Sequence, residues 1–214
     1  LPNLNSKIRP GGYGMYYHVA YYGAPRASKW LNNSQIQHMW EQLQLTYDYG
    51  VDKIWIINVG DIKPLEYPMD FFLKMAWNPK AFNANNLSDY SIAFCTQQLG
   101  GNYAHEAAEI LNAFCKFSAR MFPEMLDQNT YHLESGEFLF VKNEFLALEA
   151  KALRLYLQMP QMYKDAYYQL ILYPVQALAN LYEMYYAVAM NSKLAAEYNI
   201  EANKWADIAE TCFK

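Results

Sequence analysis

Hydrophobic and polar residues alternate near the start of the chain, over residues 11–22 (GGYGMYYHVAYY). One face of such a strand carries Gly14, Tyr16 and His18, and the residues between them form the other face. The second face is apolar enough to lie beneath helices, whereas the first begins with glycine and ends in polar aromatic residues. This gradient is typical of a barrel strand whose carboxyl end opens into a binding site.

A helical pattern follows this strand. Ser34 and Gln37 have the spacing of a capping box, and apolar residues then recur at helical spacing up to Gly50. The run 53–59 (KIWIINV) is apolar without alternation, which is typical of a parallel strand covered on both faces. The order strand, helix, strand predicts a βαβ unit whose two strands are adjacent and parallel.

The character of the chain changes near residue 79. A polar turn at 60–64 and a helix beginning near Met69 come first, and no strand pattern appears after them. Helices are predicted at about 87–98, 103–121, 139–158 and 200–213, and Pro160 and Pro174 punctuate two more. Two parallel strands with two helices cannot close a barrel or cover both faces of a sheet. Residues 1–78 are therefore expected to be the end of something larger.

Composition narrows the class of protein. The chain is 53% hydrophobic and 18% charged, which indicates a folded protein with a real core. The net charge is −4 and the basic residues are scattered, so no nucleic-acid partner is expected. No apolar stretch is long enough for a transmembrane helix. Cys95, Cys115 and Cys212 are far apart and fit neither a disulfide framework nor a metal cluster, so no metal is expected.

Tyrosine is unusually frequent, with 20 residues. A tyrosine ring packs between helices as phenylalanine does, while its hydroxyl finds a hydrogen-bond partner. The same side chain also suits sugar-binding surfaces. The count alone leaves both interpretations open.

Several stretches of the chain resemble the bacterial xylan α-glucuronidases of glycoside hydrolase family 115. They read GGYGMYYH (11–18), GAPR continuing to KW (23–30), WIINVGDIKP (55–64), FFLKMAWN (71–78) and DAYYQLILYPV (165–175). The resemblance implies a TIM-type (β/α)8 barrel followed by a helical domain, that is, α/β plus all-α structure. This chain would hold the last two β/α units of the barrel in residues 1–78 and an α-helical bundle domain in residues 79–214.

The resemblance also implies an activity. Members of this family remove glucuronic or 4-O-methylglucuronic acid, α-1,2-linked to xylose, with inversion. The expected partner is a xylan-derived oligosaccharide or polysaccharide, no cofactor is required, and a periplasmic or extracellular location is suggested. Inversion needs one carboxylic acid to protonate the leaving oxygen and one carboxylate to activate water. The resemblance places the best acid and base candidates on earlier barrel strands, so the isolated chain is expected to be inactive.

The candidate substrate-binding residues lie at the predicted strand ends. His18 could hydrogen-bond a uronate carboxylate or a sugar hydroxyl, and the alternative is a core histidine with satisfied hydrogen bonds. Asn58 interrupts an apolar strand, and its amide needs partners that substrate hydroxyls would supply. Tyr16 and Tyr21 are further candidates, although aromatic residues near a barrel rim often only pack.

Charged residues follow the second strand. Asp61 could bind substrate or orient water, which makes it the one catalytic candidate on this chain, and the alternative is a turn-capping aspartate. Lys63 could attract the negative charge of a uronate, and the alternative is a solvated lysine. His105, Glu106 and Glu109 share one predicted helix, but without a second ligand pair a solvated face is expected instead of a metal site.

Two other functions remain open. Residues 79–214 could form a non-catalytic helical interaction module, including a homodimer surface, which would not need the polar residues at the strand ends. A barrel glycosidase with a different sugar specificity is the third possibility, because fold does not fix substrate.

Overall fold

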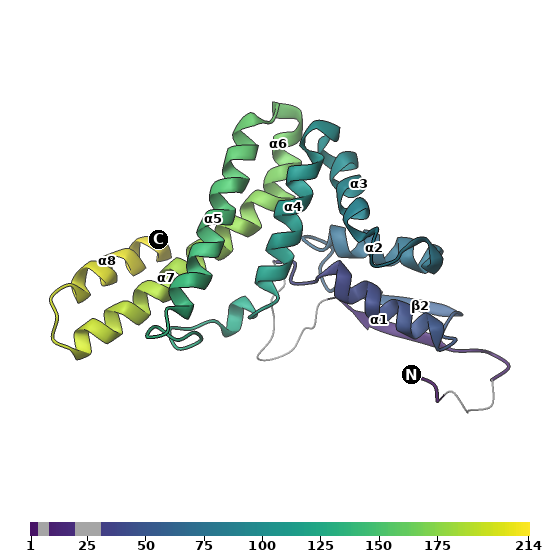
Figure 1. The fold of residues 1–214 in the computed structure, drawn as a ribbon, viewed down its shortest axis with the longest axis horizontal. Helices are drawn as coiled ribbons and strands as arrows, with labels where there is room; N and C mark the ends of the chain where they lie inside the picture. Colours follow the sequence, from purple (N-terminus) through teal and green to yellow (C-terminus); the bar gives the residue numbers. More distant parts are fainter. Residues whose placement is uncertain (4–8, 20–30) are drawn as a thin grey trace.

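The computed structural model describes residues 1–3, 9–19 and 31–214. A two-stranded parallel sheet with its helices lies at one end of the molecule, and a set of helices extends away from it (Figure 1). The first part contains β1 (Gly14–His18), α1 (Ile36–Asp48), β2 (Ile54–Asn58) and α2 (Glu66–Trp77). The second contains α3 (Leu87–Leu99), α4 (Gly101–Ser118), α5 (Glu137–Gln158), α6 (Gln161–Tyr167), the π-helical turn η3 (Tyr168–Leu172), α7 (Tyr173–Ala196) and α8 (Ala202–Phe213), with short 3₁₀ turns η1 (Pro79–Ala81) and η2 (Pro123–Met125).

The two strands pair in parallel, with α1 between them in the chain, so the predicted βαβ unit is confirmed. Gly14 lies opposite Ile54 at one end of the ladder, and His18 lies opposite Asn58 at the other. A further hydrogen bond from Val19 N to the Asn58 carbonyl, at 2.9 Å, extends the pairing by one step. The carboxyl ends of both strands therefore finish at the same edge of the sheet.

One face of the sheet packs on the helices, as the alternation in the first strand predicts. Tyr17 and Trp55 place their ring centroids 6.0 and 6.1 Å from that of Phe72 on α2. The other face is not covered by the described residues: Ile54 is 62% exposed and Ile56 is 48% exposed. The prediction of a second strand covered on both faces is therefore not met by the residues that the structure describes, although β2 has the apolar composition of such a strand.

The capping box predicted at Ser34 is wrong. Helix α1 begins at Ile36, and no side chain caps its first turn. The Ser34 hydroxyl instead donates to the Val19 carbonyl at 2.9 Å, just beyond β1. Its backbone N–H donates to Asn32 Oδ1 at 2.9 Å, so the segment before α1 is tied down by its own turn.

Helix α2 links the sheet to the helices that follow. It begins at Glu66, three residues before the predicted start at Met69, and Pro68 lies in its first turn. Backbone N–H groups in the first turn have no partner within the helix, so a proline there costs no hydrogen bond. The hydroxyl of Tyr67 lies 2.7 Å from Ser91 Oγ on α3 and donates to Asn112 Oδ1 on α4 at 3.1 Å. One hydrophobic core accordingly runs from α1 and α2 into the later helices.

Residues 85–214, all of which the structure describes, contain helices and no strand, as the sequence predicts. The structure at Pro174 differs from the break between helices that the sequence predicts. Helices α6 and α7 are joined by η3 without an intervening loop, and Pro174 lies in the first turn of α7. Pro174 has no N–H to donate to a carbonyl of the preceding turn. The change to i to i+5 hydrogen bonding in η3 accommodates this missing bond without a break in the helix.

The three cysteines differ in their surroundings. Cys95 and Cys115 are buried in the helical core, and burial raises the pKa of each thiol to about 12. Cys212 on α8 is half-buried. Both core thiols are therefore protonated and inert near neutral pH.

Candidate functional site

Three polar side chains meet on the uncovered face of the sheet, at the carboxyl ends of its strands. Asn58 Nδ2 donates a hydrogen bond to the Tyr16 hydroxyl across the sheet at 2.8 Å. The Tyr16 and His18 rings meet edge to face, with centroids 4.8 Å apart and an interplanar angle of 70°. The structure therefore brings together Tyr16, His18 and Asn58, all of which the sequence singles out.

The contacts of Asn58 orient the Tyr16 hydroxyl as a hydrogen-bond donor for a ligand. Asn58 Oδ1 accepts from the Gly60 N–H at 3.2 Å, which fixes the amide so that its NH2 group points to Tyr16. Gly60 has a positive φ of 64°, which suits glycine and lets the chain turn back over the amide. The Tyr16 hydroxyl accepts from Asn58, so its own hydrogen can be donated elsewhere. The arrangement can donate hydrogen bonds to oxygen atoms of a ligand on this face.

The loop after β2 carries the other two candidates. Asp61 and Lys63 are both exposed. Lys63 Nζ donates to Gln169 Oε1 on η3 at 3.3 Å and lies 3.9 Å from Glu66 Oε1. Gln169 Nε2 in turn donates to the same Glu66 oxygen at 3.0 Å. Lys63 therefore contacts α2 and η3, while its side chain remains 74% exposed to solvent.

Gln169 is a residue that sequence reasoning missed. Its partners Lys63 and Glu66 lie more than a hundred residues earlier in the chain. Helical periodicity assigns a polar residue at this position to a solvent face. The available signal was its place within the DAYYQLILYPV stretch. Tyr21, the remaining candidate, lies outside the described residues.

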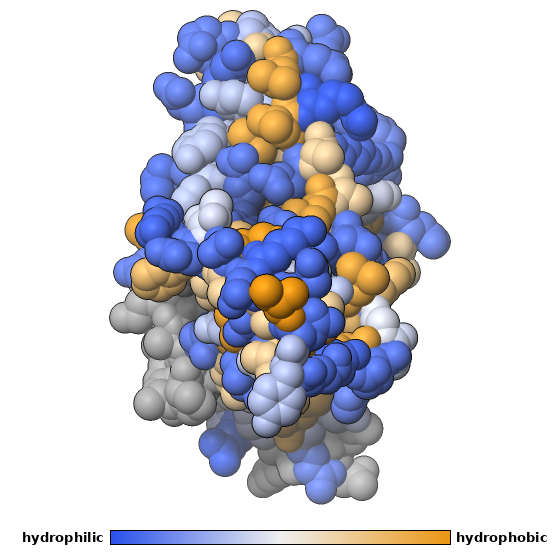
Figure 2. Space-filling view, turned by 90° about the vertical axis from the view of Figure 1, so that its left-hand side faces the viewer, coloured by the Kyte–Doolittle hydropathy of each residue, from blue (hydrophilic) through white to orange (hydrophobic). Residues whose placement is uncertain are grey.

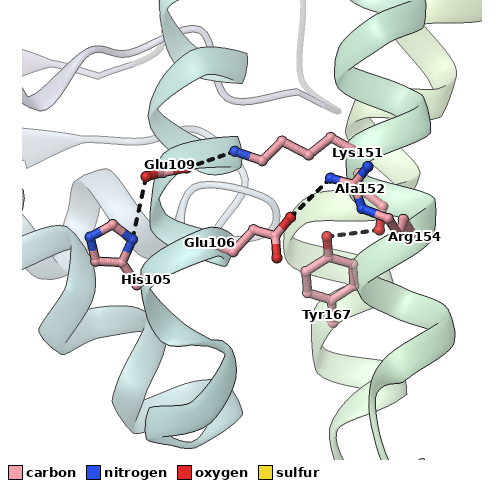
Figure 3. Close-up of polar contacts among 7 residues, drawn as sticks. All are labelled: His105, Glu106, Glu109, Lys151, Ala152, Arg154 and Tyr167. Carbon is pink, nitrogen blue, oxygen red and sulfur yellow. Dashed lines mark hydrogen bonds and ion pairs between the residues drawn. The ribbon is translucent and has the colours of Figure 1, made fainter.

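The histidine and carboxylates of α4 form ion pairs on a solvated face, as predicted (Figure 3). Glu109 lies 3.3 Å from His105 Nδ1 and 2.6 Å from Lys151 Nζ, and Glu106 lies 3.3 Å from Arg154 Nη2. The hydrogen bond and positive charge of Lys151 lower the pKa of Glu109 below its ordinary value. Within the described ranges no group of three or more potential ligands could hold a metal ion. The contacts join α4 to α5.

A cavity of about 680 Å³ lies along β1. Its lining includes the strand itself, with Tyr16 and His18, the first residues of the chain, and His38, Gln42 and Thr46 of α1. Among the described residues β1 pairs only with β2. The space beside β1 could accept another strand.

The face at the α7–α8 end of the molecule carries no single continuous hydrophobic surface among its described residues (Figure 2). Figure 2 views the molecule from its α7–α8 end and shows hydrophobic residues in separate patches between hydrophilic ones. The homodimer considered for residues 79–214 gains no support from this face. Across the described ranges, every helix is too short or too polar to cross a bilayer.

Comparison with known proteins gives two positive findings. The sequence profile of glycosyl hydrolase family 115 matches residues 1–125. A solved structure of a family GH115 4-O-methyl-α-glucuronidase, with specificity for decorated arabinogalactans, has a similar fold with a TM-score of 0.77 and 24% sequence identity. The similarity covers 99% of this chain and 29% of that chain. No curated protein sequence matches.

The two findings cover different parts of the molecule. The profile ends within the η2 turn, and the structural similarity extends over the remaining helices as well. Because the profile covers more than half of the sequence, the family assignment does not depend on the distant structural similarity. The chain belongs to glycosyl hydrolase family 115.

Proposed function

We propose that this chain is part of a glycoside hydrolase that releases glucuronic or 4-O-methylglucuronic acid from a decorated polysaccharide with inversion. The observation that carries the proposal is the joined set of Tyr16, His18 and Asn58 at the carboxyl ends of β1 and β2. Polar groups that converge at this end of parallel strands are typical of barrel active sites. Family membership supports the reaction class.

The small sheet is proposed to be the end of a (β/α)8-type barrel in residues 1–78, followed by a helical domain in residues 79–214. The uncovered face with Ile54 and Ile56 supports this architecture, because parallel sheets are ordinarily buried on both faces. The cavity along β1 supports it too, because among the described residues β1 pairs only with β2, whereas barrel strands have a partner on each side. Earlier strands of the barrel would cover both.

In this site His18, Asn58 and Tyr16 bind the uronic acid. The amide and hydroxyl donors reach sugar hydroxyls, and the imidazole reaches a hydroxyl or the carboxylate. Asp61 is the carboxylate that this chain offers near the strand ends. An inverting reaction needs two carboxyl groups about 6.5–9.5 Å apart, and the family resemblance implies that the principal acid and base lie on earlier barrel strands, outside this chain. The isolated chain is therefore proposed to be inactive.

Glucuronoxylan is the proposed substrate. The structurally similar enzyme is described as specific for decorated arabinogalactans, which makes a uronate-bearing arabinogalactan the second candidate. Both polymers offer the same terminal sugar to the site, and they differ in the backbone that carries it. Activity measured on the two polymers side by side decides between them.

The test replaces His18 and Asn58 separately by alanine in the whole enzyme. Loss of a hydrogen bond to a charged uronate costs about 1.5–3 kcal/mol, which is about ten- to a hundredfold in kcat/KM. His132→Ala and Asn203→Ala, at exposed positions elsewhere, serve as matched controls and should leave kcat/KM unchanged. An unchanged melting temperature shows that the fold survives. Near-normal release of glucuronic acid by both site variants would refute the assignment.

A further inference from the structure

The π-helical turn η3 brings two exposed tyrosines side by side. Tyr168 and Tyr173 are five residues apart, and on a regular α-helix such residues lie about 140° apart around the axis. In η3 the hydrogen bonds run from residue i to i+5, and the two ring centroids lie 6.0 Å apart at an interplanar angle of 44°. Tyr168 is 46% exposed and Tyr173 is 44% exposed. The unusual turn thus creates a pair of neighbouring aromatic rings at the surface.

The neighbouring tyrosine shows that this exposure is not simply a failure to pack. Tyr167 is fully buried, and its hydroxyl donates to the Ala152 carbonyl at 3.0 Å. Ile171 and Leu172 complete the buried side of η3. The core contacts of the turn are therefore made by other residues, and Tyr168 and Tyr173 leave much of their surface open to a ligand.

The tyrosine pair adjoins the loop that follows β2. Gln169, next to Tyr168 in the chain, accepts a hydrogen bond from Lys63 at 3.3 Å and donates one to Glu66 at 3.0 Å. Lys63 and Glu66 flank the end of the loop that begins after Asn58. These contacts hold η3, the element that carries Tyr168, against the loop that leads away from Asn58.

We propose that Tyr168 and Tyr173 form an outer subsite that binds the backbone of the polysaccharide, while the uronic acid occupies the site at the strand ends. This inference rests on the proposed function. The electron-rich face of an aromatic ring attracts the partly positive C–H groups on one side of a pyranose, and the tyrosine hydroxyl can bond to a sugar hydroxyl. Gln169, next to Tyr168 in the chain, and its partner Lys63 would offer further hydrogen-bonding groups to the sugar chain.

A carbohydrate fits this surface better than a protein partner does. The aromatic pair consists of two half-exposed rings, and the polar residue Gln169 adjoins Tyr168 in the chain. A stable protein interface requires a much larger surface, with a hydrophobic centre and a polar rim. Two rings with polar neighbours match the size and mixed polarity of a short stretch of sugar chain.

The experiment compares a polymer with a short substrate in the whole enzyme. Tyr168→Ala/Tyr173→Ala is expected to lower kcat/KM on polymeric glucuronoxylan about tenfold, or about 1.4 kcal/mol, and to leave hydrolysis of a glucuronosyl-xylose disaccharide unchanged. Binding of the debranched polymer, measured by affinity electrophoresis, should weaken in parallel. The double phenylalanine variant keeps the rings and should retain most of the binding. Phe213→Ala, on α8, is the exposed aromatic control.

Equal losses on polymer and disaccharide, or unchanged polymer binding by the double alanine variant, would overturn the subsite. The binding measurement does not depend on catalysis. Failure of the wild-type enzyme to release glucuronic acid would therefore count against the proposed function alone, while polymer binding would still decide the role of the two tyrosines.

Discussion

The buried hydrogen bonds of Tyr67 permit a quantitative test of how α2 is joined to the helices after it. Tyr67 is 2% exposed, and its hydroxyl lies 2.7 Å from Ser91 Oγ and 3.1 Å from Asn112 Oδ1. Tyr67→Phe keeps the ring but removes both contacts. Asn112 Oδ1 then retains only the longer contact from Ser91, at 3.4 Å.

Removal of one partner from a buried polar pair costs about 1–3 kcal/mol, because the remaining group stays desolvated. For a protein of this size that corresponds to a fall in melting temperature of about 2–12 °C. Ser91→Ala removes the other side of the shortest contact. The double variant should therefore lose less than the sum of the single losses, with a coupling of about 0.5–1.5 kcal/mol.

The measurement is urea unfolding of the wild type, the two single variants and the double variant, with the slope m compared across the set. Tyr103→Phe is the control, because that hydroxyl makes only a long contact of 3.5 Å at the surface, and it should change stability little. Additivity of the two substitutions within about 0.3 kcal/mol would refute the argument that the hydrogen bond joins α2 to α3.

Three further predictions concern the helical part. Phe145→Ala should cost about 3–5 kcal/mol in urea unfolding, because Phe145 is fully buried with its ring centroid 4.3 Å from that of Tyr182, and a loss below about 1 kcal/mol would contradict this packing. Gly100→Ala should lower the melting temperature, because Gly100 has φ 76° and ψ 155°, a conformation that costs other residues about 1–3 kcal/mol; an unchanged melting temperature would count against that conformation. Glu109→Gln should reduce stability by less than about 1 kcal/mol at pH 7. Because Lys151 lowers the pKa of Glu109 in the folded chain, this contribution is fully present above the ordinary value of 4.5 and is lost as the pH falls through the lowered pKa. Variant and wild type should therefore converge at the acid end of the pH series, and a difference that persists once Glu109 is protonated would exclude the ion pair as its source.

Much of this fold can be predicted because local patterns determine it. Alternation places Tyr16 and His18 on one face of β1, and the apolar run around Trp55 predicts β2 beside it. Once the two strands are known to be parallel and adjacent, His18 and Asn58 must share an edge. The polar cluster of the candidate site follows from strand order and register alone.

The features that could not be predicted depend on contacts between distant residues. Ser34 has the sequence context of a helix cap, yet its hydroxyl is used by the Val19 carbonyl. Hydrophobic periodicity does not predict the π turn that brings Tyr168 and Tyr173 together. One extra residue in a single turn shifts the helical pattern by less than the pattern can resolve. Gln169 gains its partners only when η3 packs near the loop after β2.

The contrast among the three cysteines gives the chain an internal chemical reporter. A thiol-specific dye reacts with accessible thiolate, so in the folded protein it should label Cys212 first. Cys95 and Cys115 lie in the core that also holds α3 and α4, and they become reactive only when those helices separate. The time course of labelling at the two core positions would therefore measure how often this core opens under native conditions, without any engineered label.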